Sequence, residues 1–255
     1  TKFQIALDLQ HEDGRSETRT VWVKTGMESV NNEIKDHQKI YAGEAYFYRE
    51  IAGKYHTRAP HCYFAEVDDD GNSALVLEDL ETLGARFIEP TESQSPDTIA
   101  SALEYVAKYQ AATWNLPELL ASEYLMAGGF WGIGNVLDWM YDQDHWNEYA
   151  ERPRFQALAP ELRNRDLLLD AHRKQKDDWW THGPLVLTHG DAHLGQLYQM
   201  PDGDVRLLDW QCVRMAHWGF DPSNIMVSGL SAENRRAHAR TLWQHYVTKL
   251  KEFGV

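Results

Sequence analysis

The chain has few cysteines and no long apolar run, and both absences narrow the class of protein. Only Cys62 and Cys212 occur among 255 residues, which excludes a small disulfide-stabilised secreted scaffold. We therefore expect two free, buried thiols in a reducing compartment, the cytoplasm. No apolar stretch approaches the roughly 20 residues of a membrane-spanning helix. The segment Thr1 to Leu9 carries Asp8 and does not look like a cleavable signal, so we expect no membrane partner.

Positive charge is scarce relative to negative charge. Lys and Arg number 25 against 39 Asp and Glu, and the net charge is -14. This balance excludes nucleic-acid binding through a basic patch. Solubility is the simplest role of the charge, and attraction of a cationic substrate is the alternative. Hydrophobic residues make up 43% of the chain, which is enough for one large domain or two small lobes.

Strands dominate the predicted structure of the first 80 residues. Residues 3–9 and 20–24 predict two strands joined by a polar turn, and residues 61–67 and 74–80 predict a second pair. Apolar residues at helical spacing predict one helix over 35–55. This part of the chain is therefore expected to form a small β-rich lobe.

Helices dominate the remainder. Ser95 is a predicted N-cap, because Pro96 follows it at the first helical position. The predicted elements are helices at 95–114, 130–142, 155–180 and 231–252, and a strand pair at 185–188 and 197–208. The pattern predicts an α+β fold with an N-terminal lobe, 1–80, and a larger α-helical lobe, 81–255. A cleft between two lobes is a common ligand site.

The segment HGDAHLGQLYQMPDGDVRLLDW, residues 189–210, carries the strongest chemical signal. Asp191 follows a predicted buried strand and the turn residue Gly190, and a second strand pair around 201–204 ends at Asp209. Gln196 lies between the two aspartates, five positions after Asp191. A carboxylate that orients a hydroxyl, with a second carboxylate and an amide that hold magnesium, would make a phosphoryl-transfer site.

Two other interpretations of this segment remain open. It can be an ordinary hairpin with surface aspartates at its ends. Alternatively, His189, Asp191 and His193 form an H-x-D-x-H pattern, and clusters of this kind bind zinc or iron.

A lysine and a glutamate in the N-terminal lobe form a second candidate constellation. Lys24 ends a predicted strand, TVWVK, and Glu44 lies in the following helix. A lysine held by a helix glutamate can reach the α and β phosphates of ATP. Lys35 and Glu50 lie near enough in sequence to be alternative partners, and both Lys24 and Glu44 can also be plain surface charges.

These motifs together resemble those of a known superfamily of small-molecule kinases. HGDAHLGQ is similar to the HGDxHxxN motif of aminoglycoside phosphotransferases, choline kinases and ecdysteroid-kinase-like proteins. LLDWQ resembles their metal-binding segment, the helix GEAYFYREI resembles their ExxFY helix, and ALVLEDL, residues 74–80, is most similar to the ecdysteroid-kinase-like branch. The resemblance implies a bilobal protein-kinase-like fold that uses ATP and Mg²⁺.

The resemblance also implies roles for individual residues. Asp191 is the expected catalytic base, and Asp209 is a magnesium ligand, with Gln196 in the place of the usual asparagine. Lys24, held by Glu44, would contact the phosphates. Backbone groups near Glu78, Asp79 and Leu80 would bind the adenine edge, and Asp221 would support the catalytic loop and cap a helix.

Substrate-binding residues are predicted from composition rather than from motif. His193 packs the catalytic loop in the simplest interpretation and contacts substrate in the alternative. The aromatic run from 130 to 146 is core in the simplest interpretation. It can also form a substrate wall, in which Trp131 and Trp139 stack on the ligand and Asp138 or Asp144 pairs with an amine.

Some features depart from the family pattern. We expect the first strand and a glycine-rich loop to be missing before FQIALDL, and helix to be missing after HYVTKLKEFGV, so that both ends look trimmed.

The expected function is ATP- and magnesium-dependent phosphorylation of a small-molecule hydroxyl. The alternatives are a catalytically impaired nucleotide-binding protein, motivated by Gln196, and a His/Asp metallohydrolase. Steroid, aminoglycoside, choline-like amine and macrolide substrates all stay open, as does the oligomeric state.

Overall fold

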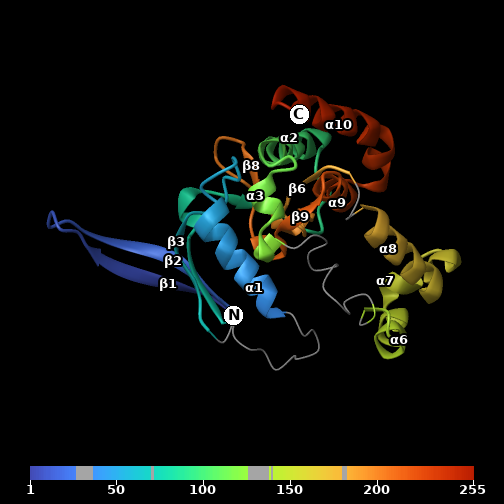
Figure 1. Ribbon diagram of the computed structural model, residues 1–255, viewed down its shortest axis with the longest axis horizontal. Helices are drawn as coiled ribbons and strands as arrows, with labels where there is room; N and C mark the ends of the chain where they lie inside the picture. Colours follow the sequence, from blue (N-terminus) through green and yellow to red (C-terminus); the bar gives the residue numbers. More distant parts are fainter. Residues whose placement is uncertain (27–36, 70–71, 126–137, 139, 180–182) are drawn as a thin grey trace.

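The computed structural model describes residues 1–255 except 27–36, 70–71, 126–137, 139 and 180–182. The α+β fold is as expected, with a β-rich N-terminal part followed by a largely helical part (Figure 1). Among the helices in the described ranges, none combines the length and the apolar character that a membrane span requires.

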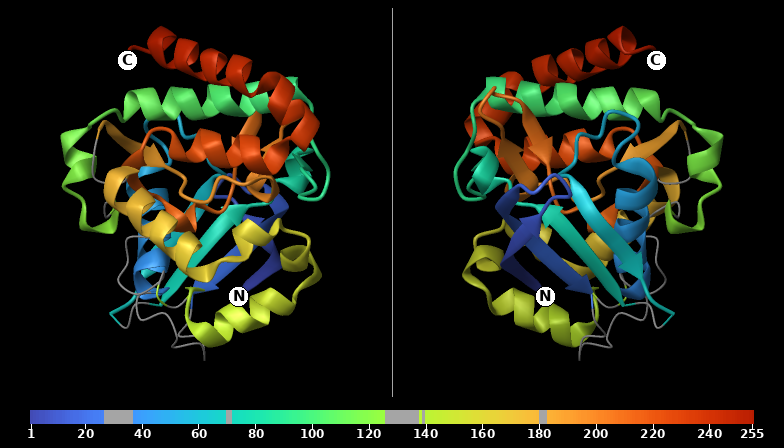
Figure 2. Two further views of the ribbon diagram at one scale, coloured as in Figure 1. Left: turned by 90° about the vertical axis from the view of Figure 1, so that its right-hand side faces the viewer. Right: turned by 90° about the vertical axis from the view of Figure 1, so that its left-hand side faces the viewer.

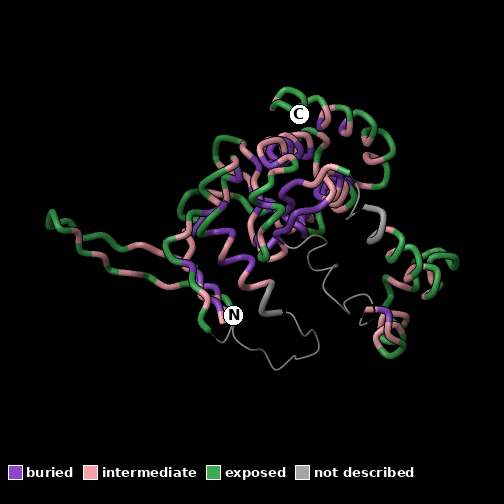
Figure 3. Tube along the Cα trace, in the orientation of Figure 1, coloured by how far each residue is buried: buried purple, intermediate pink, exposed green. Residues whose placement is uncertain are grey.

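The N-terminal part is one antiparallel sheet with a helix beside it. Its strands are β1 (Lys2–Gln10), β2 (Ser16–Gly26), β3 (Cys62–Val67) and β4 (Ser73–Glu78), in the spatial order β1-β2-β4-β3. The β1–β2 hairpin is longer than predicted and extends from the body as an arm with an exposed tip (Figures 1 and 3). Helix α1 (His37–Tyr46) continues into a π-helical turn, Phe47–Ile51, so the predicted helix over 35–55 is confirmed over 37–51.

The C-terminal part is built on helices around two small sheets. Helix α10 packs along α2 (Figure 2), and the predicted cap of α2 is confirmed, because the Ser95 side chain accepts a hydrogen bond from the Thr98 N–H. The elements are η2 (Glu81–Leu83), β5 (Arg86–Phe87), α2 (Pro96–Ala112), α3 (Pro117–Leu120), η3 (Glu123–Leu125), α6 (Gln143–Glu151), α7 (Pro153–Gln156), η4 (Pro160–Arg163), α8 (Arg165–Trp179), β6 (Leu185–Thr188), η5 (Leu194–Gln196), β7 (Leu197–Gln199), β8 (Val205–Leu207), η6 (Trp210–Cys212), β9 (Arg214–His217), α9 (Phe220–Gly229) and α10 (Ala232–Glu252).

The strand pairing corrects one expectation. The predicted hairpin over 197–208 is present as β7 and β8, and its turn contains Gly203 at φ 89°. Strand β6, however, pairs with β9 in an antiparallel register, Leu187 opposite Met215, and not with the hairpin. The sequence RMAH of β9 has too few apolar residues for its strand to be recognised.

The predicted helix over 155–180 is wrong as one continuous element. Pro153 begins α7, Pro160 begins a 3₁₀ turn, and only α8 is a long helix. Proline lacks the N–H that an interior helical position donates, and it disfavours helical backbone in the residue before it. Helix α6 was not predicted; Asp142 caps it by accepting from the Asp144 and His145 N–H groups. The predicted helix over 130–142 falls mostly outside the described residues.

A stacked aromatic pair joins the two parts of the core. Phe47, the first residue of the π-helical turn after α1, lies 4.2 Å from Trp210, centroid to centroid, with the rings 9° from parallel. Both side chains are fully buried, and Tyr109 of α2 contacts Trp210 edge-on. This contact holds α1 against the segment that follows Asp209, so it also positions the residues described below.

Replacement of Phe47 by alanine is expected to lower the free energy of unfolding by about 3–5 kcal/mol, because it leaves a cavity against Trp210. The same substitution at Phe64, which is 48% exposed, is the matched control and should change it by roughly 0.5 kcal/mol. Denaturant titration measures both. Equal effects in the two variants would contradict the assigned contact.

Candidate active site

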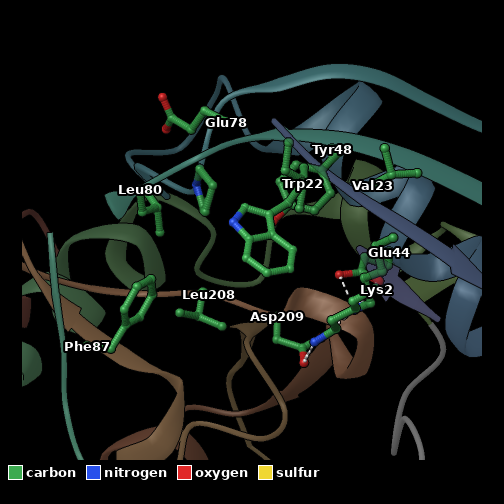
Figure 4. Close-up of a pocket in the computed structure, with 13 residues that line it drawn as sticks. Lys2, Trp22, Val23, Glu44, Tyr48, Glu78, Leu80, Phe87, Leu208 and Asp209 are labelled. Atoms are coloured by element: carbon green, nitrogen blue, oxygen red, sulfur yellow. Dashed lines mark hydrogen bonds and ion pairs between the residues drawn. The ribbon is translucent and has the colours of Figure 1, made fainter. Parts of the chain in front are cut away.

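A cavity of about 230 Å³ lies where the N-terminal sheet meets the end of β8 (Figure 4). One end is largely apolar and the other gathers charged side chains. The cavity is lined by Lys2, Trp22, Val23, Lys24, Glu44, Tyr48, Pro60, Leu77, Glu78, Leu80, Phe87, Leu208 and Asp209. The expected residues Lys24, Glu44, Glu78, Leu80 and Asp209 thus share one cavity.

Lys24 stands at the centre of the charged end. Its Nζ lies 2.7 Å from Glu44 Oε2 and 2.5 Å from Asp209 Oδ1. The ion pair expected between Lys24 and Glu44 is therefore present, and both residues are buried. The alternative partner Glu50 is instead half-exposed, with Lys54 at 4.0 Å, and Lys35 lies outside the described residues.

The two carboxylates keep the centre of this cluster charged. Burial lowers the pKa of Lys24, but Glu44 and Asp209 outweigh it, so that the pKa lies above its ordinary value. Burial raises the pKa of Asp209, but the opposing ammonium groups of Lys24 and Lys2 hold it at about 2. Asp209 is therefore an ionised carboxylate at neutral pH.

Asp209 takes a backbone conformation that few side chains tolerate. Its φ of 66° lies in the left-handed region, where aspartate is accepted more readily than most residues. Its second oxygen, Oδ2, lies 3.0 Å from Lys2 Nζ. Sequence reasoning missed Lys2, although extending the hairpin register would have placed it opposite Lys24.

The loop that carries Asp191 is held from behind by a buried carboxylate. Asp221 accepts hydrogen bonds from the N–H of His189 (2.7 Å) and of Gly190 (3.1 Å), and from the hydroxyl of Tyr109 (2.7 Å). It thus supports the loop as expected. It does not cap α9, whose N-cap is Gly219, because both of its oxygens are turned toward the loop.

Gly190 is required for this loop to close. Its φ is 83°, and a Cβ at this position would lie 2.0 Å from the carbonyl oxygen of Cys212. Only glycine combines this backbone conformation with such a close approach. The loop before Asp191 therefore lies directly against the segment after Asp209.

Asp191 is half-exposed, and burial raises the pKa of its carboxyl above the ordinary value. His193 Nε2 lies 3.7 Å from Asp191 Oδ2, while its Nδ1 accepts a hydrogen bond from the Gly195 N–H at 3.0 Å. This contact agrees with the expected packing role of His193 in the loop.

The ring of His189 does not face an open metal site. Its Nε2 bonds the carbonyl of Leu208 at 2.8 Å, and its Nδ1 accepts from the Asp191 N–H at 3.3 Å. In the described ranges, no group of three or more His, Cys, Asp or Glu side chains could hold a metal ion together. The interpretation of H-x-D-x-H as a zinc or iron site is therefore disfavoured, because His189 is already engaged.

Gln196 lies beside the strand end that carries Asp209. The N–H of Leu208, the residue before Asp209, donates to the Gln196 carbonyl at 2.9 Å, so the backbone of Gln196 lies next to that of Leu208. A carboxylate and an amide oxygen suit magnesium, which commonly takes one or two carboxylates and completes its shell with phosphate and water. The donor set of Asp209 and Gln196 therefore fits the implied metal.

The segment Glu78–Leu80 closes the apolar end. The Asp79 side chain is buried and accepts hydrogen bonds from Gln4 Nε2 (2.8 Å) and Trp22 Nε1 (3.3 Å). This fixes the Trp22 indole across the cavity, between the Leu80 end and the Asp209 end (Figure 4). Trp22 and Gln4 were missed because an exposed strand face carries no apolar signal.

Of the residues expected to form a substrate wall, the structure describes only the two acids. Trp131 and Trp139 lie outside the described residues. Asp138 is exposed and pairs with Arg173 at 2.9 Å, and Asp144 lies in the first turn of α6. Neither acid lines the cavity.

Solved structures share this fold. The chain resembles the GDP and kanamycin complex of APH(2")-IIia with a TM-score of 0.54 and 12% identity, over 96% of this chain and 82% of that one. It resembles an aminoglycoside-3'-phosphotransferase of type VIII with a TM-score of 0.52 and 14% identity, over 97% and 93%. It resembles the macrolide 2'-phosphotransferase MphH from Brachybacterium faecium with a TM-score of 0.51 and 13% identity, over 100% of this chain and 77% of that one. Such low identity shows the fold alone, which is the expected protein-kinase-like fold.

No curated protein matches the chain closely enough to be reported as a relative. The sequence profile of one family does match, over residues 2–127 and 132–254, which is nearly the whole chain. This family is the branch that the sequence ALVLEDL resembles most. This chain belongs to the ecdysteroid kinase-like family.

Proposed function

We propose that this protein transfers a phosphoryl group from ATP to a hydroxyl group of a small molecule, with magnesium. The observation that carries the proposal is the position of Lys24, which is held between Glu44 and Asp209 at one end of a cavity. The family and the fold support a small-molecule kinase. The parts act mainly by positioning and charge stabilisation, as phosphoryl transfer requires.

The base of the nucleotide would occupy the apolar end of the cavity. Trp22, whose orientation is held by Asp79, supplies an aromatic surface, and Phe87 and Leu208 line the same end. Backbone groups of the segment from Glu78 to Leu80 would read the edge of the adenine. The carbonyl of Leu80 already accepts hydrogen bonds from the N–H groups of Leu83 and Ala85. Other backbone groups of this segment would therefore contact the adenine.

The phosphates would lie at the charged end. Lys24 donates to the α and β phosphates while Glu44 holds its ammonium group in place. Asp209 and Gln196 would hold magnesium, which neutralises charge on the phosphates when bound. Because Asp209 has a pKa of about 2, it is ready to serve as a ligand at neutral pH.

Asp191 would act on the acceptor. Its carboxylate orients the substrate hydroxyl and accepts the proton as the new bond to phosphorus forms. The backbone of its loop is held by Asp221 and by the close contact of Gly190 with Cys212, so the carboxylate is pre-positioned. The exposure of Asp191 leaves room for a substrate to approach.

The acceptor is a small alcohol whose identity stays open. Two proteins of similar fold are an aminoglycoside phosphotransferase and a macrolide phosphotransferase, and both of these substrate classes carry hydroxyl groups. The family of this chain is named after ecdysteroid kinases. The same proposal includes a division of the chain into two lobes near Leu80. It also includes a cytoplasmic location. Both cysteines are free in the structure, in keeping with a reducing compartment, although they are partly buried and not fully buried as expected.

Asp191→Asn should lower turnover by about 10²–10⁴-fold while the affinity for nucleotide changes little, because it removes only the proton acceptor. Turnover is measured as ATP consumption with a panel of small alcohols, and affinity by calorimetry. Asp138→Asn, at an exposed acid outside the cavity, is the control and should leave both unchanged. Equal losses of turnover and affinity would contradict the role given to Asp191. Nucleotide binding without any consumption in the wild type would favour the impaired alternative.

Asp209→Ala should abolish the part of the nucleotide affinity that depends on magnesium, since it removes the carboxylate ligand. The measurement is ADP affinity with magnesium and with a chelator. Asp202→Ala removes an exposed acid from the turn of the same hairpin and is the control. A magnesium dependence that survives in Asp209→Ala would sink the metal assignment.

A further inference from the structure

We infer that Lys2 is a second phosphate-binding cation of this site, which occupies Asp209 until a nucleotide arrives. The inference rests on the proposed function, because it concerns the same cavity. The residue was not recognised from the sequence and has no counterpart among the motifs discussed above.

The hairpin register brings Lys2 to the phosphate end. Lys2 and Lys24 are directly opposite each other on the antiparallel strands β1 and β2. Side chains opposite one another in such a pair point to the same face, and here both line the cavity. Lys24 Nζ bonds Asp209 Oδ1, and Lys2 Nζ bonds Oδ2 at 3.0 Å, so that each lysine holds one oxygen.

The two lysines differ in how tightly they are held. The Lys24 side chain is 10% exposed and also bonds Glu44, which is buried. The Lys2 side chain is 53% exposed, and in the described part of the chain its only ion pair is with Asp209. Lys2 can therefore leave Asp209 at little cost, whereas Lys24 cannot. An exposed ion pair of this kind contributes little stability.

The charge at this end favours a second cation beside a polyphosphate. Lys24, Glu44 and Asp209 together carry a net charge of −1, and Lys2 is the other cation among the described residues that line the cavity. A carboxylate oxygen that binds a metal must release the ammonium group that covers it, and for Oδ2 of Asp209 that group is Lys2. When Asp209 serves as such a ligand, the ammonium of Lys2 is displaced toward the phosphate oxygens that lie beside it. Lys2 thus bonds the Asp209 carboxylate before the nucleotide binds, and it contacts the phosphates afterwards.

The test is the binding of ADP, AMP and adenosine, with magnesium, to the wild-type chain, Lys2→Met and Lys2→Arg. Lys2→Met keeps the length of the side chain and removes the charge. It should weaken ADP binding by about 10-fold or more, as expected for a charge-assisted hydrogen bond. Its affinity for adenosine should stay within about 2-fold, with AMP between, and Lys2→Arg should retain most of the ADP affinity.

Arg15→Met is the matched control, since Arg15 is a cation near the exposed tip of the same hairpin and pairs only locally with Asp13. It should leave all three affinities unchanged.

Tighter ADP binding in Lys2→Met would overturn the inference, because Lys2 would then only block Asp209. An equal loss for adenosine and ADP would also overturn it, because the effect would then be on the cavity. If the wild type binds ADP and Lys2→Met binds it equally, the inference alone fails. If the wild type binds no ADP, the proposed function fails with it.

Discussion

The buried ammonium group of Lys24 is the interaction on which the rest of the site depends. Its two carboxylate partners come from different parts of the chain, Glu44 from α1 and Asp209 from the end of the β7–β8 hairpin. A buried charge is costly unless it is paired and hydrogen-bonded. The sheet, the helix and the hairpin must therefore meet at one place. The Phe47–Trp210 stack packs the same helix and segment together through apolar contact, so packing and charge specify one arrangement.

A second buried carboxylate gives the site its other half. Asp221 satisfies two backbone N–H groups in the loop before Asp191, and Gly190 allows that loop to touch the backbone of Cys212. Asp191 and Asp209 are thus presented by segments that are in direct contact. Burial is the main cause that raises the pKa of Asp191, and the charge of Asp209 adds to it. A site of this kind is organised before its ligands arrive, which is how positioning lowers a barrier.

Local signals in the sequence were sufficient for the α+β fold and for the hairpin turn at 201–204. The pairing of Lys24 with Glu44 was one of several that the local sequence left open, and it was expected because of the family resemblance. Local signals were not sufficient for long-range choices. The partner of β6 is β9, which lies past the whole hairpin, and no local pattern encodes that register. The role of Asp221 depends on backbone groups more than thirty positions away, and it was expected only from the family resemblance. Lys2 and Trp22 lie on a strand face that points into a cavity, and such a face looks the same in sequence as one that points into water.

The central claim is that Lys24 and its neighbours form a site for nucleotide phosphates, and covalent labelling tests it most directly. An acyl phosphate derivative of ATP transfers its acyl group to lysines next to bound phosphates, and mass spectrometry locates the product. The account predicts modification at Lys24 or Lys2 that excess ATP prevents. Labelling spread evenly over exposed lysines such as Lys54 and Lys174, with no protection by ATP, would contradict it.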